Sequence, residues 1–152
     1  VPMGAVAVSR AVHDAIVEGA PEGIELFHGY TYSGHPLAAA AGLATLALYK
    51  AEGLFNRAAE LGDYWENAVH SLKGKRHIID VRNLGIVAGI ELEPRAGAPG
   101  KRATELFHKC FDNGLLIRAT ADIIALSPPL ILEKAHIDEM VGRIAELVGT
   151  ID

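Results

Sequence analysis

The chain contains one cysteine, Cys110, among 152 residues, so it cannot form a disulfide bond within itself. It also lacks a basic stretch, because 14 lysine and arginine residues stand against 19 acidic ones and the net charge is −5. Nucleic acids and anionic membrane surfaces both attract clustered positive charge, so neither is expected as a partner. A chain of this length buries enough surface to fold without disulfides, and a lone thiol fits a reducing compartment. We therefore expect a cytoplasmic protein.

No apolar run is long enough to cross a membrane. The longest, from Leu37 to Tyr49, is shorter than the ~20 residues that a spanning helix needs. The first residues, Val1-Pro2-Met3-Gly4, include no basic segment ahead of an apolar one, so they do not resemble a secretory signal. The chain also does not start with methionine. We expect it to be a piece of a longer protein.

The seven histidines form no pattern that is typical of a metal site. His28 and His35 flank one loop, but no third ligand follows them at a suitable spacing, and no metal is expected. Cys110 falls on the apolar side of a predicted helix. This position favours a buried structural thiol over a catalytic nucleophile.

The first quarter of the chain predicts a strand, a helix and a long loop. Small apolar residues at Gly4–Val8 predict a buried strand, and Ser9 is suited to cap a helix that ends near Gly19. The glycine-rich stretch that follows, up to Gly34, predicts a long loop. Pro36 then predicts the start of a long alanine-rich helix, because the missing N–H of proline costs nothing in the first turn.

Beyond Gly53, helical and alternating patterns follow one another. Apolar residues spaced three and four apart from Leu54 to Leu72 predict an amphipathic helix. Strict alternation over Leu84–Leu92 predicts a strand with one buried face. The other expected elements are strands at Ile78–Val81, Leu115–Arg118 and Ile123–Ser127, a helix that ends at Asn113-Gly114, and a final helix from about Glu133. Helices and hairpin-like strands are segregated after Pro36, which predicts an α+β class with helices packed on one antiparallel or mixed sheet.

Two features could carry chemistry. The segment from His28 to Pro36 combines hydroxyls, aromatic rings and glycines just before a helix N-terminus, where the helix dipole favours a bound anion. The same composition also suits a connector whose tyrosines simply pack. Arg118 stands between apolar residues in a short predicted strand. It either binds a carboxylate or phosphate, or lies in solvent at a strand end.

Five segments in this order resemble those of a known family: Pro2–Val6, His28–Pro36, Asp80–Gly85 with Gly89–Leu92, Gly114–Arg118, and Leu126–Leu130. They resemble the C-terminal part of class III aminotransferases, which are pyridoxal-phosphate enzymes of fold type I. The similarity is greatest to the ω-amino acid:pyruvate aminotransferases and extends over nearly the whole chain. It implies that residues 1–35 end a large cofactor-binding domain and that residues 36–152 form a small C-terminal α+β domain.

The resemblance also implies roles for single residues. Thr31 would hydrogen-bond the phosphate of pyridoxal 5'-phosphate across a dimer interface, and Tyr30 would offer a backbone N–H beside it. Arg118 matches the arginine that binds the substrate carboxylate. The parent protein would be a homodimer with a shared active site. It would move an amino group from an ω-amino acid or another amine to pyruvate.

The resemblance places the family's Schiff-base lysine a few residues before Pro2–Val6, and therefore upstream of Val1. None of the lysines present stands at the matching place: Lys50, Lys73, Lys75, Lys101, Lys109 and Lys134. Pyridoxal chemistry needs an activated amine, so we expect this chain alone to be inactive. Two alternatives stay open at this point. One is a fragment of a related class III mutase or decarboxylase, and the other is a free-standing α+β interaction module without catalysis.

Overall fold

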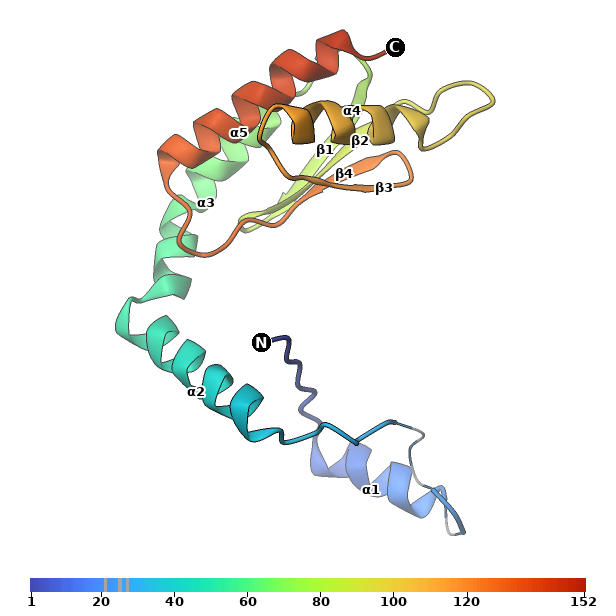
Figure 1. Ribbon diagram of the computed structural model, residues 1–152, viewed down its shortest axis with the longest axis vertical. Helices are drawn as coiled ribbons and strands as arrows, with labels where there is room; N and C mark the ends of the chain where they lie inside the picture. The colour runs from blue at the N-terminus through green and yellow to red at the C-terminus, as the bar shows by residue number, and fades with distance from the viewer. Residues whose placement is uncertain (21, 25, 27) are drawn as a thin grey trace. The chain divides into compact units, whose positions relative to one another are not determined.

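The computed structural model describes residues 1–20, 22–24, 26 and 28–152, and it forms two compact units (Figure 1). We call them the N-terminal unit, Val1–Glu52, and the C-terminal unit, Gly53–Asp152. The helices are α1 (Arg10–Glu18), α2 (Pro36–Ala51), α3 (Leu54–His70), α4 (Lys101–Asp112), α5 (Lys134–Leu147) and the 3-10 helix η1 (Val148–Thr150). The strands are β1 (Ile78–Leu84), β2 (Val87–Leu92), β3 (Arg118–Thr120) and β4 (Ile123–Leu126). None of the described helices has the length and hydropathy to span a membrane.

The N-terminal unit contains α1 and α2, and both begin where the sequence predicts. The hydroxyl of Ser9 accepts a hydrogen bond from the backbone N–H of Val12 at 3.4 Å, which caps α1. Pro36 opens α2. The predicted strand at Gly4–Val8 is wrong, because the segment is exposed and has no regular secondary structure. A strand needs a neighbour for its backbone N–H and C=O groups, and the described residues of this unit provide none.

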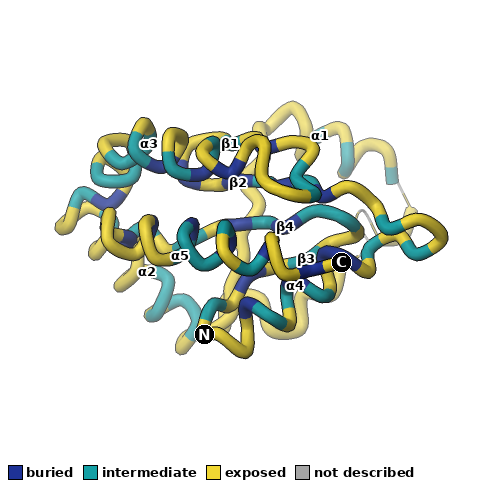
Figure 2. The backbone as a smooth tube through the Cα atoms, turned by 90° about the horizontal axis from the view of Figure 1, so that it is seen from above, coloured by how far each residue is buried: buried dark blue, intermediate teal, exposed yellow. Residues whose placement is uncertain are grey.

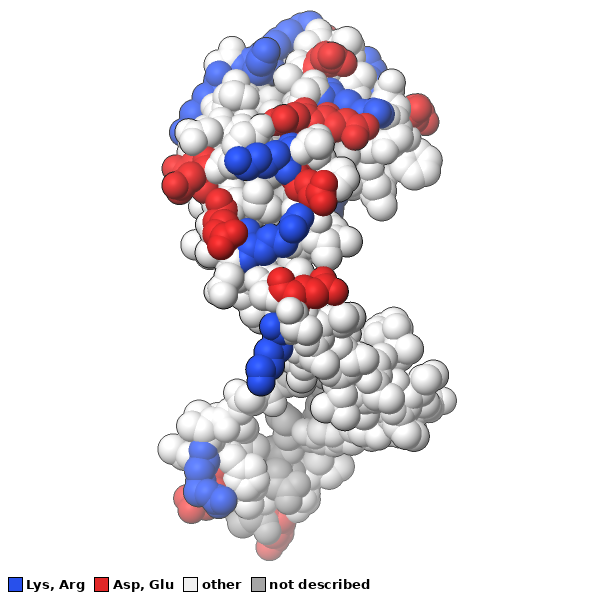
Figure 3. Space-filling model, turned by 90° about the vertical axis from the view of Figure 1, so that its left-hand side faces the viewer, with Lys and Arg blue, Asp and Glu red and all other residues white. Residues whose placement is uncertain are grey.

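Helix α2 exposes much of its apolar surface. Its exposed leucines are Leu37, Leu43, Leu46 and Leu48. Met3 lies against Gly42 of this helix, where an added Cβ would come within 2.9 Å of the methionine sulfur. Charged side chains of both signs cover the visible face of the C-terminal unit, whereas the N-terminal unit shows few of them (Figure 3). Neither α1 nor α2 contains a buried residue.

The C-terminal unit is an antiparallel four-stranded sheet in the order β1-β2-β4-β3. Helices α3, α4 and α5 lie over one face of it, which confirms the predicted α+β class (Figure 1). The buried residues gather in this unit, on the strands and on the helix faces turned toward them (Figure 2). The largest are Trp65, Leu72, Ile90, Leu92, Leu106, Ile124, Ile137, Ile144 and Ile151.

The alternation in the second predicted strand is confirmed for all but its first residue. Ile86, Ala88, Ile90 and Leu92 are buried. Leu84 instead ends β1 and is 86% exposed, since Gly85 turns the chain with a φ of 54°. Such a positive φ is what a tight hairpin turn requires and what glycine adopts without strain.

The predicted strand at Leu115–Arg118 is wrong over most of its length, and β3 begins only at Arg118. The reason is the end of α4. The backbone N–H of Leu115 donates to the carbonyl of Cys110 at 2.8 Å, and Gly114 adopts a φ of 78°. These features close the helix in the manner of a glycine C-cap, so this part of the backbone is not free to pair as a strand.

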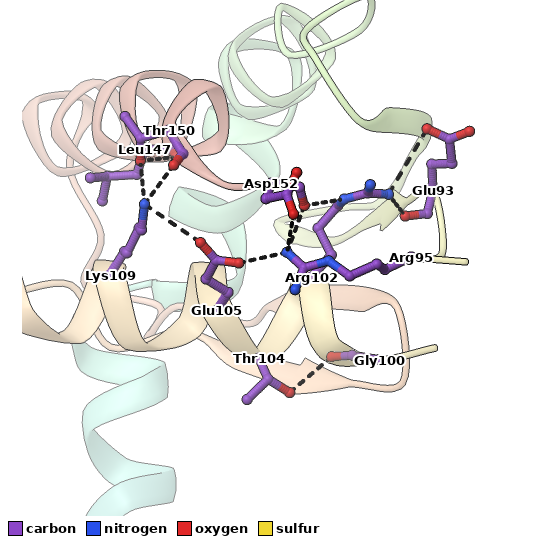
Figure 4. A network of polar contacts seen from close by, with 10 residues as sticks. All are labelled: Glu93, Arg95, Gly100, Arg102, Thr104, Glu105, Lys109, Leu147, Thr150 and Asp152. Atoms are coloured by element: carbon purple, nitrogen blue, oxygen red, sulfur yellow. Dashed lines mark hydrogen bonds and ion pairs between the residues drawn. The ribbon is translucent and has the colours of Figure 1, made fainter. Parts of the chain in front are cut away.

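A network of polar contacts fastens the last residues of the chain to α4 (Figure 4). Arg102, the buried charged residue of the described part, donates from Nε to the carbonyl of Asp152 at 2.9 Å and also donates to the carbonyl of Glu93. Arg95 reaches the same Asp152 carbonyl at 2.7 Å. Arg95 also donates to the Glu105 carboxylate at 2.7 Å, and this hydrogen bond lowers the pKa of that carboxyl.

We expect Ile90→Ala to lower the free energy of unfolding of the C-terminal unit by about 2–5 kcal/mol, because Ile90 is fully buried and its removal leaves a cavity. Urea titration followed by tryptophan fluorescence measures this, since Trp65 is the single tryptophan and is fully buried in the same core. Leu46→Ala is the matched control, because Leu46 is 62% exposed and lies in the other unit. Equal midpoints for the two variants would contradict this account of the core.

Candidate functional site

The first candidate site is the turn that leads into α2. The backbone N–H of Ser33 donates to the carbonyl of Tyr30 at 2.9 Å, and that of His35 donates to Tyr32 at 3.2 Å. Gly34 takes a φ of 70° in this turn. These hydrogen bonds therefore fold residues 30–35 into a compact turn just before the N-terminus of α2.

Thr31 lies in this turn and lines a pocket of about 380 Å³ together with Met3, Ser33 and Ala38. Its side chain is exposed, and its hydroxyl has no hydrogen-bond partner among the described residues. His35, the N-cap of α2, also makes no side-chain cap. A free hydroxyl and uncapped N–H groups at a helix N-terminus can together bind an anion. Tyr30 is 59% exposed, and its ring lies edge-on to that of His28.

The second candidate site is in the C-terminal unit. Arg118 opens the edge strand β3, where it is paired with Ala125 of β4, and its side chain is exposed. It lines a pocket of about 540 Å³ between the ends of β3 and β4 and the first half of α5. The side chain of Arg118 has no hydrogen bond or ion pair within the described part of the chain. Its guanidinium is therefore free to bind a carboxylate.

The rest of this pocket comes from residues that the sequence did not single out. His136, Glu139, Met140 and Arg143 line it from one side of α5. Arg143 is bound to Glu139 at 2.6 Å, and the ring of His136 accepts the N–H of Glu133 at 3.2 Å. The spacing of these residues along α5 places them on one face of a helix, which was the available signal. Arg118 is thus the cation of the pocket that is left without an acidic partner among the residues described.

Comparison with known proteins shows to which family the chain belongs. The model of the class-III aminotransferase family matches residues 1–148. The chain belongs to the class III aminotransferase family. An omega-aminotransferase from Caulobacter vibrioides is 65% identical over 152 residues, which are 100% of this chain and 35% of that protein.

Two further similar proteins are more distant. A beta-alanine–pyruvate aminotransferase from Pseudomonas aeruginosa is 36% identical over 99% of this chain and 34% of its own length. A transaminase structure from directed evolution by ancestral reconstruction superposes with a TM-score of 0.77 at 33% identity, over 94% of this chain and 33% of that one. The chain therefore spans about a third of the length of the relatives that it matches.

The pocket at Thr31 fits a phosphate contact and does not fit covalent attachment of pyridoxal phosphate, which needs a lysine. No lysine lines the pocket at Thr31. In the C-terminal unit, Lys109 donates to the carbonyl of Thr150 at 2.6 Å, and Lys134 lies over the ring of Tyr64. The amines of Lys109 and Lys134 therefore both make contacts within the C-terminal unit. Tyr30 and Thr31 belong to the N-terminal unit, and Arg118 belongs to the C-terminal unit.

The prediction of a buried structural thiol is confirmed. Cys110 is fully buried in the core, and burial raises the pKa of its thiol to about 11. A neutral buried thiol is a poor nucleophile. Within the described ranges, His, Cys, Asp and Glu side chains form no group of three that could hold a metal ion.

We expect Cys110 to resist alkylation in the folded chain. At pH 8 a thiol with a pKa of about 11 is ionised to roughly one part in a thousand, whereas an exposed thiol is ionised to about a quarter. Iodoacetamide labelling followed by mass spectrometry should therefore be slow in buffer and complete in denaturing urea. Equal labelling rates in both solutions would show that the thiol is accessible.

Proposed function

We propose that this chain is the C-terminal part of a class III aminotransferase that uses pyridoxal 5'-phosphate and moves an amino group from an ω-amino acid or another amine to pyruvate. The 65% identity to the Caulobacter omega-aminotransferase over the whole chain carries this proposal. The relative named for β-alanine and pyruvate supports the choice of acceptor. Because the relatives reported above are aminotransferases, they favour this activity over a mutase or a decarboxylase.

Arg118 binds the carboxylate of the keto-acid acceptor in this proposal. Its guanidinium is exposed at the edge of the sheet, lacks an acidic partner among the described residues, and faces a pocket lined by Pro128 and Met140. A guanidinium can donate two parallel hydrogen bonds to a carboxylate, which fixes both the position and the orientation of the acid. The apolar part of the lining, such as Pro128 and Met140, can contact the remainder of a small substrate.

Thr31 contributes the cofactor contact of the proposal. Its free hydroxyl donates to the phosphate, and Tyr30 adds its backbone N–H beside it. Pyridoxal phosphate, when bound, supplies the electron sink for amino transfer. The lysine that holds it would lie upstream of Val1, and the phosphate would belong to the other subunit of a homodimer.

The proposed domain division follows the same reasoning. Residues 1–35 would end the large cofactor-binding domain, and residues 36–152 would form the small C-terminal domain. Pro36 opens α2, so the proposed border coincides with the start of a helix, whereas the two compact units of the structure divide between Glu52 and Gly53. We further propose a cytoplasmic location for the parent enzyme, in keeping with the single, buried thiol of this chain.

The proposal that the cofactor-binding lysine lies outside this chain is tested by adding pyridoxal phosphate to the 152-residue chain, followed by borohydride reduction and mass spectrometry. We expect no stoichiometric label on any lysine and no transaminase activity, because in this proposal the lysine that forms the Schiff base with the cofactor is not among these residues. The full-length Caulobacter relative is the positive control and should carry one label. Stoichiometric labelling of a single lysine in this chain would place the active amine here and refute the proposal.

In the full-length protein, Thr31→Ala should weaken cofactor binding by roughly ten- to a hundredfold, because it removes a hydrogen bond to a charged group. Thr31→Ser keeps the hydroxyl and should retain most of the affinity. The measurement is titration of the dialysed protein with pyridoxal phosphate, followed by visible absorbance.

Thr45→Ala is the matched control for this titration. The Thr45 hydroxyl donates to the carbonyl of Ala41 within α2, at 2.9 Å, so its loss should leave the affinity unchanged. If Thr31→Ala binds the cofactor as tightly as the unmodified protein does, then Thr31 does not contact the phosphate.

A further inference from the structure

The strand that carries Arg118 has only a short backbone pairing to hold it in the sheet. β3 consists of Arg118–Thr120, lies at the edge of the sheet, and pairs with β4 alone. Each backbone hydrogen bond contributes about 1 kcal/mol to stability, so a pairing this short leaves the strand only weakly fixed. On one side of Arg118 the chain is held by the buried Ile117, and on the other the position of the strand depends on how the turn between β3 and β4 is held.

That turn is attached to its surroundings by one residue, Asp122. Its backbone carbonyl accepts the N–H of Leu92, at the end of β2, at 2.8 Å. Its side-chain Oδ1 accepts the N–H of Gly100, just before α4, also at 2.8 Å in a partly buried position. The preceding residue, Ala121, has a φ of 49°, which is uncommon for a residue other than glycine. The hairpin is thus held in a specific turn conformation against two other elements.

The backbone at Gly100 is closely packed. It is the N-cap of α4 with a φ of 77°, and an added Cβ would lie 3.5 Å from the carbonyl oxygen of Ala121, so the two backbones are in close contact. Two residues further on, the buried Arg102 binds backbone carbonyls of Glu93 and Asp152 (Figure 4). The Asp122 carboxylate therefore connects the hairpin to the most firmly held end of α4.

The Asp122 carboxylate has no other role among the described contacts. It forms no ion pair with a lysine, arginine or histidine of the described residues, and its one side-chain bond is to the N–H of Gly100. A carboxylate that accepts a backbone N–H forms a stronger bond than a neutral acceptor does. Removing the side chain deletes this bond and leaves the backbone bond to Leu92 in place.

We propose that Asp122 is a positioning residue for Arg118: it holds the β3–β4 hairpin against α4, so that the guanidinium of Arg118 stays where it meets the substrate carboxylate. Only the second half of this proposal, the placing of the Arg118 guanidinium at the substrate carboxylate, rests on the proposed function. Its first half, the local anchoring of the hairpin, concerns this chain alone and is tested without substrate.

The first test is hydrogen–deuterium exchange on the 152-residue chain. Asp122→Ala should raise amide exchange across residues 118–125 by roughly ten- to a hundredfold, with β1 and β2 unchanged. Asp122→Asn keeps an acceptor oxygen and should restore most of the protection. Asp63→Ala is the control, because Asp63 is an exposed residue of α3 with no side-chain bond among the described contacts. Unchanged exchange at 118–125, or an equal rise in β1 and β2, would overturn the proposal.

The second test uses the full-length enzyme with two acceptors, pyruvate and an aldehyde that lacks a carboxylate. Asp122→Ala should raise KM for pyruvate severalfold, leave both constants for the aldehyde unchanged, and be rescued by Asp122→Asn. Equal effects on both acceptors would overturn the positioning role.

Arg118→Met separates this proposal from the proposed function. If Arg118→Met leaves KM for pyruvate unchanged, the assignment of Arg118 to the substrate carboxylate fails, together with the second half of the present proposal. The exchange experiment still decides whether Asp122 anchors the hairpin, because that measurement does not involve the substrate.

Discussion

Burial of one face of the antiparallel sheet under α3, α4 and α5 determines the remainder of the C-terminal unit. Ile90 and Ile124 face one another across β2 and β4 with no exposed surface, and Trp65 packs in the same core. Because side chains alternate along a strand, a shift of one residue would expose this whole set to water. The same alternation that buries Ile117 leaves Arg118 exposed at the pocket. The core thus fixes which side of the sheet is available for chemistry.

The N-terminal unit has no comparable core among its described residues. Helix α2 is built from alanine and leucine on every side, and Lys50 is its one charged residue. A helix that is apolar all round is typical of a protein interior. This composition, with a match to only about a third of each relative, supports the proposal that the chain is part of a longer enzyme. The turn that contains Thr31 belongs to this unit, so its geometry depends on fewer contacts than that of Arg118.

The sequence predicts those elements that local chemistry decides. Pro36 sets the start of α2, and alternating residues set the buried face of β2. The two failed predictions have different causes: Gly4–Val8 has no strand beside it, and the N–H of Leu115 is taken by the carbonyl of Cys110 as α4 ends. The candidate site divides in the same way. Short motifs suffice to single out Thr31 and Arg118, whereas tertiary packing alone brings the α5 side of the pocket to Arg118.

The edge of the sheet that presents Arg118 depends on a few partly buried polar contacts more than on surface charge. The Arg143–Glu139 pair is largely exposed, and such pairs add at most about 1 kcal/mol. Arg82 lies across β1 and β2 between Glu91 and Asp80, which raises its pKa, but all three side chains are open to solvent. By contrast, a backbone group that loses a buried partner costs about 1–3 kcal/mol. The bonds of Asp122 and Arg102 to backbone atoms are of that kind. In the proposal for Asp122, a site on a three-residue edge strand is therefore positioned by the loops on either side of α4.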